Sequence, residues 1–433
     1  MNDPSRDCAP FDKCARRRQS GALTSLALAC ICVAVLSTAG EATAGETAAL
    51  HGHMHGLLWR VGKYSALVSL DGKPRPYARP YPAFTDPEQD RAETLQIVKK
   101  IDENLADQKE ITGLVIQVGW RELEPRQGKY DWDFLDRVVE VAHKNNVFYK
   151  LIIIPGYECP AWLYAKGIDA LDAPFSDSRA ANPAATVESR SIPIPWDETY
   201  LSFFMGLLRK VAERYKNDPL CYAVVLTGAS SRWEEMHLPS SSQAMEKWKS
   251  FGDYKGKLVE FYKRLIDDYV QIFPYQQICP SITPPLPGMN KELEEIIGYG
   301  VEKYPDRFTL QNCQLHGRND NTGNISYRLI MEYNAKVHNG LQDERGFEKR
   351  TEPSSGSLEQ MILNYIRVDS EYLEMGLDAQ KPFVVDRWVA GLKIAQSLGY
   401  EGYKQLLEKA GLPKIQLPQG ANRSRQIRNP KKH

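Results

Sequence analysis

The chain has 433 residues, of which 42% are hydrophobic, and its 55 Lys and Arg balance 55 Asp and Glu to a formal net charge of zero. This composition is that of an ordinary globular protein, so it excludes a disordered or fibrous chain. The even charge balance gives no electrostatic reason to bind a polyanion, and we expect no nucleic-acid partner.

The first 44 residues have the order of a secretory signal peptide. Arg16-Arg17-Arg18 precede a run of small and apolar residues from Ala22 to Ala39, and Ala42-Thr43-Ala44 supplies a small-x-small cleavage site. The apolar run approaches the ~18 residues that cross a bilayer, so an uncleaved membrane anchor is the alternative. The prediction is a secreted or periplasmic protein.

Cysteine and histidine spacing indicates neither a metal nor an organic cofactor. Of the eight cysteines, the four beyond the leader are Cys159, Cys221, Cys279 and Cys313, and none forms a close metal-ligand pair. Those that fall in predicted strands are expected to be buried free thiols. The early run His51-Gly-His-Met-His55 alternates in the way a strand could present ligands, but no nearby carboxylate or further histidine completes a metal site.

Strands and helices alternate along the rest of the chain. Seven β-branched or apolar stretches predict strands: Leu114–Val118, Phe148–Ile154, Cys221–Leu226, Ile278–Ile282, Phe308–Gln311, His338–Leu341 and Tyr372–Met375. The segments between them carry apolar residues at helical spacing. Four of these helices have a predicted capping residue at their start, namely Asp86, Asp197, Asn290 and Ser357.

This alternation predicts an α/β fold with parallel strands joined by right-handed crossovers. One further strand closes a (β/α)₈ TIM barrel, and Tyr64–Leu70 is its candidate. A doubly wound open sheet is the alternative, but no glycine-rich phosphate loop opens a helix. We therefore predict a single catalytic barrel over residues 86–415, preceded by an extended segment, 45–85, that holds the first strand, and followed by a basic tail, 416–433.

One stretch carries a recognisable motif. Trp120-Arg-Glu-Leu-Glu-Pro-Arg-Gln-Gly-Lys-Tyr-Asp-Trp132 has the form W-x-x-L-E-P-x-x-G-x-Y-D-W. It resembles the second strand, loop and helix of clan A (β/α)₈ glycoside hydrolases, particularly bacterial beta-galactosidase-like enzymes. Pro155-Gly156 and Pro160-Ala-Trp162 support the resemblance, which covers about residues 111–238. Within the motif, Glu124 is expected to hold its own loop by hydrogen bonds to the backbone.

The resemblance implies a retaining glycosidase, with an acid/base carboxyl after the fourth strand and a nucleophile at the end of the seventh. In retaining enzymes these two groups stand ~5 Å apart. Glu235 is the predicted acid/base, with Glu234 as the alternative, and Glu344 is the predicted nucleophile, with Asp343 as the alternative. The chain departs from the clan pattern because Thr227-Gly228-Ala229 stands where Asn-Glu is usual.

Other residues near the predicted strand ends suit a saccharide, whose apolar C–H face stacks on indole rings. The predicted substrate-binding residues are Trp120, Trp162, Trp233, His237, Gln314, His316 and Gln342. The predicted function is hydrolysis of an O-glycosidic bond in a saccharide. An inactive barrel that binds carbohydrate and a metal-dependent hydrolase that uses the early histidines are the alternatives. Glu374, in the eighth strand, is either a carboxylate of the rim or a buried structural one.

Overall fold

The computed structural model describes residues 55–62, 87–172, 191–231, 233–318, 320–343, 356–376 and 382–410. All of them belong to one compact unit, residues 47–433. The predicted leader, the basic tail, His51 and His53 lie outside the described residues. Within the described ranges, no helix is both long and apolar enough to span a bilayer.

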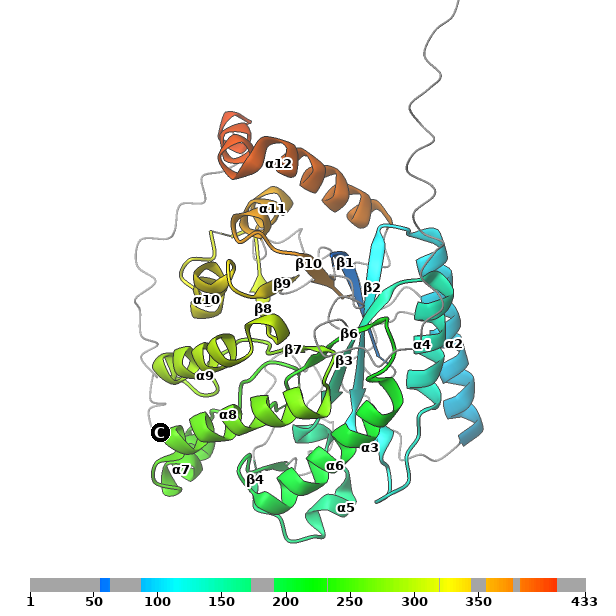
Figure 1. The fold of residues 1–433 in the computed structure, drawn as a ribbon, viewed down its shortest axis with the longest axis vertical. Helices are drawn as coiled ribbons and strands as arrows, with labels where there is room; N and C mark the ends of the chain where they lie inside the picture. Colours follow the sequence, from blue (N-terminus) through cyan, green and yellow to red (C-terminus); the bar gives the residue numbers. More distant parts are fainter. Residues whose placement is uncertain are drawn as a thin grey trace, which may run out of the picture. The chain divides into compact units, whose positions relative to one another are not determined.

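The core of this unit is a ring of parallel strands (Figure 1). The strands are β1 (Gly56–Gly62), β2 (Ile111–Gly119), β3 (Phe148–Ile154), β6 (Cys221–Val225), β7 (Gln277–Cys279), β8 (Thr309–Leu315), β9 (His338–Asp343) and β10 (Tyr372–Met375). Their order in the sheet is β7-β6-β3-β2-β1-β10-β9-β8. Parallel bridges from Ile278 to Phe308 and from Ser281 to Gln311 join the two ends. The sheet therefore closes in chain order, and the predicted (β/α)₈ barrel is confirmed.

The first strand does not lie where the sequence analysis placed it. β1 pairs with both β2 and β10 and is Gly56–Gly62, whereas the predicted 64–70 lies outside the described residues. The side chains of β1 explain why its sequence is hard to recognise as a strand. Trp59 packs outward in the main core and Leu58 packs inward, while Arg60 brings a charge into an otherwise apolar stretch. A two-stranded antiparallel ribbon, β4 (Ala170–Asp172) with β5 (Ser191–Pro193), follows β3.

Helices surround the barrel (Figure 1). They are α2 (Pro87–Asp107), α3 (Trp120–Leu123), α4 (Asp133–Asn145), α5 (Ala161–Tyr164), α6 (Glu198–Tyr215), α7 (Ser242–Ser250), α8 (Tyr254–Ile272), α9 (Asn290–Lys303), α10 (Ile325–Tyr333), α11 (Leu358–Arg367) and α12 (Pro382–Lys409), with 3₁₀ turns η1 (Gly156–Glu158) and η2 (Pro305–Arg307). Asp197 and Ser357 cap their helices as predicted. Asn290 does not, because it is the first residue of α9 and Met289 holds the cap position without a side-chain bond.

Charged side chains from several strands meet inside the closed ring. Lys150 of β3 and Glu374 of β10 are fully buried, and Nζ lies 2.9 Å from Oε2. Gln311 of β8 accepts a hydrogen bond from Lys150 and donates one of 3.1 Å to Glu374. The hydroxyl of Tyr372 donates to the same glutamine over 2.9 Å. Buried charges are tolerated when they are paired and hydrogen-bonded, so Glu374 is a structural carboxylate and not a group of the rim.

The Lys150–Glu374 pair gives a stability prediction. Lys150→Met removes one partner of a buried pair, and we expect a loss of about 3–5 kcal/mol in the free energy of unfolding. Lys150→Met/Glu374→Gln removes both charges and should recover part of that loss. The control is Lys263→Met, which removes a half-exposed pair with Glu295 and should cost less than about 1 kcal/mol. Urea unfolding measures all three, and equal losses in Lys150→Met and the control would contradict the prediction.

Candidate active site

The loop after β6 carries the two predicted acids to the end of the barrel where the strands finish. Leu226 still donates to the carbonyl of Cys279 over 2.9 Å, so the chain leaves the sheet only after it. It returns at Glu235, which forms a parallel bridge with Ser281, and the N–H of Met236 donates to the carbonyl of Ser281. Loops that follow the strands form the catalytic face of such barrels. The acids therefore lie on that face.

The loop after β3 packs against the loop after β6 that carries Glu234 and Glu235, here called the acid loop. The N–H of Tyr157 donates to the carbonyl of Ser231 over 2.8 Å. The neighbouring Gly156 has a φ of +59°, and a Cβ at this position would lie 2.2 Å from the carbonyl oxygens of Ser230 and Ser231. Only glycine combines this backbone conformation with so close an approach. From α8, Tyr262 donates from its hydroxyl to the carbonyl of Met236 in the acid loop.

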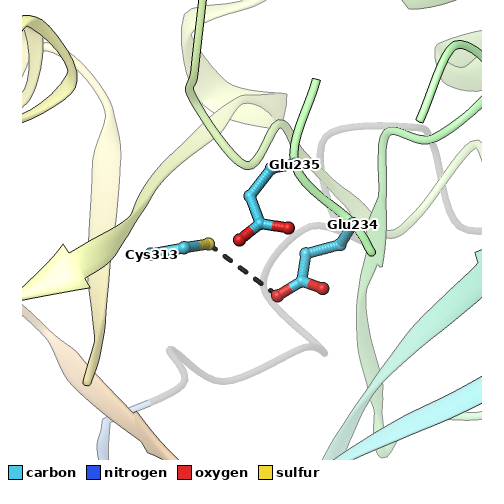
Figure 2. A group of neighbouring side chains, drawn as sticks. All are labelled: Glu234, Glu235 and Cys313. Carbon is cyan, nitrogen blue, oxygen red and sulfur yellow. Dashed lines mark hydrogen bonds between the residues drawn. The ribbon is translucent and has the colours of Figure 1, made fainter. Parts of the chain in front are cut away.

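Glu234 is fully buried and bound on both carboxylate oxygens. The guanidinium of Arg60, from β1, forms an ion pair with Oε2. The thiol of Cys313, from β8, lies 3.8 Å from Oε1 (Figure 2). In the amide orientation that satisfies its neighbours, Gln342 of β9 donates to Oε1 over 2.9 Å and accepts from Arg60 over 2.7 Å. Glu234 is therefore held on both carboxylate oxygens by groups from three strands.

Glu235 has a different environment from its neighbour. It is partly exposed, and its Oε2 has no hydrogen-bond partner among the described residues. Figure 2 shows its carboxyl group directed toward the space between Cys313 and Glu234. Burial of the carboxyl and the charge of Glu234 raise the pKa of Glu235 to about 8, against an opposing effect of Arg60. Glu235 thus carries a proton at neutral pH, whereas Glu234 is paired with a cation.

Glu234, Glu235 and Cys313 are also the one group in the described part of the chain whose atoms are close enough to share a metal ion, with one atom from each within 4.8 Å of the others. Their chemistry favours a proton instead. A cation here would compete with Arg60 for Glu234. It would also need a thiolate, and burial together with the two carboxylates raises the pKa of Cys313 well above its usual value. Of the three early histidines, only His55 is described.

Two other residues predicted for substrate belong to the acid loop itself. Trp233 and His237 flank the acid pair and are both partly buried. Burial lowers the pKa of His237, against the charge of Glu234. The predicted nucleophile Glu344 lies outside the described residues, and its alternative, Asp343, is a buried residue at the end of β9.

Trp120 was predicted to bind substrate, but it is a core residue. Its side chain is fully buried against Phe204 and Trp162, with ring centroids 5.5 and 6.0 Å apart. Its indole N–H donates to Glu124 over 2.9 Å, and Trp162 donates to the carbonyl of the same glutamate. Glu124 also accepts from the N–H of Gly128, so it holds its loop as predicted. The W-x-x-L-E-P-x-x-G motif therefore stabilises the loop after β2 through hydrogen bonds to Glu124.

Gln314 and His316 follow the part of β8 that faces the acids. Gln314 is exposed, and it accepts from Asn324, the capping residue of α10. Asn312, two positions earlier, contacts the same asparagine, so both side chains lie on the helix side of the strand. Nδ1 of His316 accepts from the N–H of Arg318 over 3.3 Å. The structure therefore gives Gln314 a structural contact where the sequence analysis predicted substrate binding.

Two residues of the site, Arg60 and Cys313, are not predicted from the sequence. For Arg60, the available signal of a buried functional charge was a lone arginine inside an apolar stretch. The predicted sixth strand ended at Gln311, but β8 continues to Leu315, and inward alternation from Gln311 reaches Cys313.

The fold and the site together define an α/β barrel with a pair of unequal carboxyl groups at its carboxyl-end mouth. Residues 81–262 match the glycoside hydrolase 42 family model, described as beta-galactosidase. The resemblance to bacterial beta-galactosidases that the motif indicated is therefore confirmed over this part of the chain.

Individual relatives align over limited lengths. A beta-galactosidase of Heyndrickxia coagulans is 25% identical over 182 residues, which is 40% of this chain and 26% of that protein. One of Clostridium perfringens is 28% identical over 198 residues, 44% of this chain and 27% of that protein. A solved beta-galactosidase from Rahnella sp. R3 aligns with a TM-score of 0.45 and 12% identity over 80% of this chain and 57% of that one. The chain spans about a quarter or less of the length of the curated relatives.

The contact between the two loops can be tested with Gly156→Ala. A methyl group there must displace the Ser230–Ser231 backbone, and the left-handed conformation adds about 1–2 kcal/mol of its own. Gly167→Ala is a matched control, because Gly167 has a φ of +75° with open space around its Cβ position. We expect urea unfolding to show a clearly larger loss for Gly156→Ala. Equal losses in the two variants would mean that the close approach does not matter.

Proposed function

We propose that this protein hydrolyses the O-glycosidic bond of a saccharide, with β-galactosides as the first substrates to test. The match of residues 81–262 to the beta-galactosidase family model supports the reaction class. The observation that carries the proposal is the placement of Glu235 beside the ion-paired Glu234 at the mouth of the barrel, where burial and the neighbouring charge raise its pKa to about 8 so that it retains a proton at neutral pH. Glycoside cleavage requires such a proton for the leaving oxygen.

In the proposed retaining mechanism, Glu235 donates its proton to the glycosidic oxygen while a carboxylate attacks the anomeric carbon. This step forms a glycosyl-enzyme and releases the leaving group as an alcohol. Water then hydrolyses the glycosyl-enzyme, and Glu235 takes a proton from that water. Glu344 is the proposed nucleophile. Glu234 is unsuited to that role, because it is fully buried and both of its oxygens are bound.

The surroundings of Glu235 suit a sugar ring. Trp233 is the adjacent aromatic residue on the acid loop, and we propose that its indole stacks on the saccharide. His237 is held neutral by burial and can orient a hydroxyl group. The order of residues 16–44 supports export of the protein as part of the same proposal, with the saccharide met outside the cytoplasm.

The role of Glu235 can be tested by comparing leaving groups. Glu235→Gln removes the proton donor, so we expect hydrolysis of an alkyl β-galactoside to fall by about 10²–10⁴-fold. A dinitrophenyl β-galactoside, whose leaving group needs no proton, should lose far less in its first step. Glu158→Gln is the control, because it removes a rim carboxylate paired with Arg121 and should leave both rates nearly unchanged. An equal fall in the hydrolysis rates of both substrates would mean that Glu235 is not the proton donor.

The pH dependence follows from the same group. The active form of Glu235 is protonated, and its pKa is raised to about 8. Hydrolysis of the alkyl galactoside should therefore persist through neutral pH and decline as the pH rises through about 8. The alkaline limb of kcat/KM measures this decline, and Glu235→Gln should abolish the limb. An alkaline limb near the ordinary glutamate pKa of about 4.3 would contradict the assignment.

A barrel that binds saccharides without cleaving them is the second candidate. The end of β6 favours it, because Thr227 there uses its hydroxyl to bond the carbonyl of Ile153 and presents no carboxyl group. Calorimetric titration with galacto-oligosaccharides distinguishes the two functions. Binding without product release in the wild-type protein supports this candidate, whereas turnover lost in Glu344→Gln supports the hydrolase.

A further inference from the structure

The proposed chemistry makes no use of Arg60, although this side chain contacts two buried carboxylates, Glu234 and Glu374. It lies on β1 and reaches Glu234, 174 positions later in the sequence. Its Nε donates to Gln117 over 3.0 Å and lies 3.5 Å from Glu374. Its remaining nitrogens bind Glu234 and, over 2.7 Å, Gln342. A buried arginine with acceptors on all three nitrogens has a fixed position.

Among the described residues, the buried charges inside the barrel balance only if Glu235 is neutral. Two buried cations, Arg60 and Lys150, face two carboxylates, Glu234 and Glu374, which are ion-paired with them. An ionised Glu235 would add a negative charge next to Glu234 without a cation of its own, and an unpaired charge in a low-dielectric interior is costly. The cheapest distribution leaves Glu234 ionised and the proton on Glu235.

We propose that Arg60 is a positioning residue for Glu235: by binding Glu234 from across the barrel, it fixes a negative charge beside the Glu235 carboxyl and so determines which of the two adjacent glutamates carries the proton. The effect of Arg60 on catalysis rests on the proposed function. Its effect on which glutamate carries the proton does not depend on that function. Arg60 itself touches no reacting atom in this scheme.

The groups that face Glu235 come from four places in the fold. They are Glu234 on its own loop, Arg60 on β1, Cys313 on β8 and Glu374 on β10. Loss of the Glu234 charge leaves Arg60 as the nearest charge to Glu235 and so lowers the pH at which Glu235 ionises. Loss of Arg60 removes the partner of Glu234, so the charge beside Glu235 is no longer fixed and the two glutamates share the proton.

A carboxyl titration of the full-length protein tests the proposal directly. The probe is ¹³C NMR of protein labelled at the glutamate side-chain carboxyl, with Glu235 assigned by the signal that Glu235→Gln removes. In the wild type, one glutamate should titrate near pH 8. In Glu234→Gln, we expect that titration to move down by more than about one pH unit, since one unit corresponds to about 1.4 kcal/mol of interaction. In Arg60→Met, the charge beside Glu235 is no longer fixed, so the titration of Glu235 should depart from the wild-type curve.

Two further variants separate positioning from folding. Arg60→Lys keeps a cation opposite Glu234 and should retain the wild-type titration of Glu235, even if the protein is less stable. Arg121→Met removes another arginine–glutamate pair of the rim, and it should leave the titration unchanged. If the titration of Glu235 stays at the wild-type pH in both Glu234→Gln and Arg60→Met, Arg60 is only structural and the proposal fails.

The alkaline limb of kcat/KM should move by the same amount as the NMR titration in each variant. A wild-type protein that cleaves no β-galactoside would refute the proposed function, yet the NMR result would still decide the role of Arg60. Conversely, an active enzyme whose Glu235 titrates alike in all Arg60 and Glu234 variants would refute the role of Arg60 alone.

Discussion

Buried charges inside the closed barrel must be paired, and this requirement explains how the site is arranged. Eight parallel strands direct alternate side chains into one enclosed space, so residues far apart in the sequence become neighbours there. Arg60 and Lys150 are buried in that space, and each must have an anionic partner. Glu234 and Glu374 fulfil this requirement. The ion pairs connect the acid loop after β6 with strands on the opposite side of the barrel.

This constraint gives two adjacent glutamates different chemistry. Glu234 is a structural group that pairs with a guanidinium and contacts an amide and a thiol. Glu235 lies at the edge of the same cluster without an ion-pair partner in the described part of the chain, and burial and the charge of Glu234 raise its pKa to about 8. Enzymes commonly separate the pKa values of neighbouring carboxyl groups through such unequal environments. Here the unequal pair lies on the loop after β6, at the end of the barrel where the strands finish.

The rim that holds this pair is assembled from loops that brace one another. The motif around Trp120 and Glu124 is an internal support, in which two indole N–H groups and a backbone N–H converge on one glutamate. The loop after β3 contacts the acid loop at Gly156. The match of residues 81–262 to the beta-galactosidase family model covers all of these parts. The shared sequence therefore includes much of the scaffold beneath the site.

The alternation of strands and helices, and with it the expectation of a barrel, could be predicted from the residues alone, because hydrophobic periodicity is a local property. The sequence also pointed to Glu235, since acids that follow a buried strand lie at the carboxyl end of the sheet. The folded protein was needed to show that Arg60 binds Glu234, that Trp120 belongs to the core and that Gln314 contacts Asn324. These outcomes depend on contacts between distant segments. They are fixed when the barrel closes, and no local pattern encodes which side chains then meet.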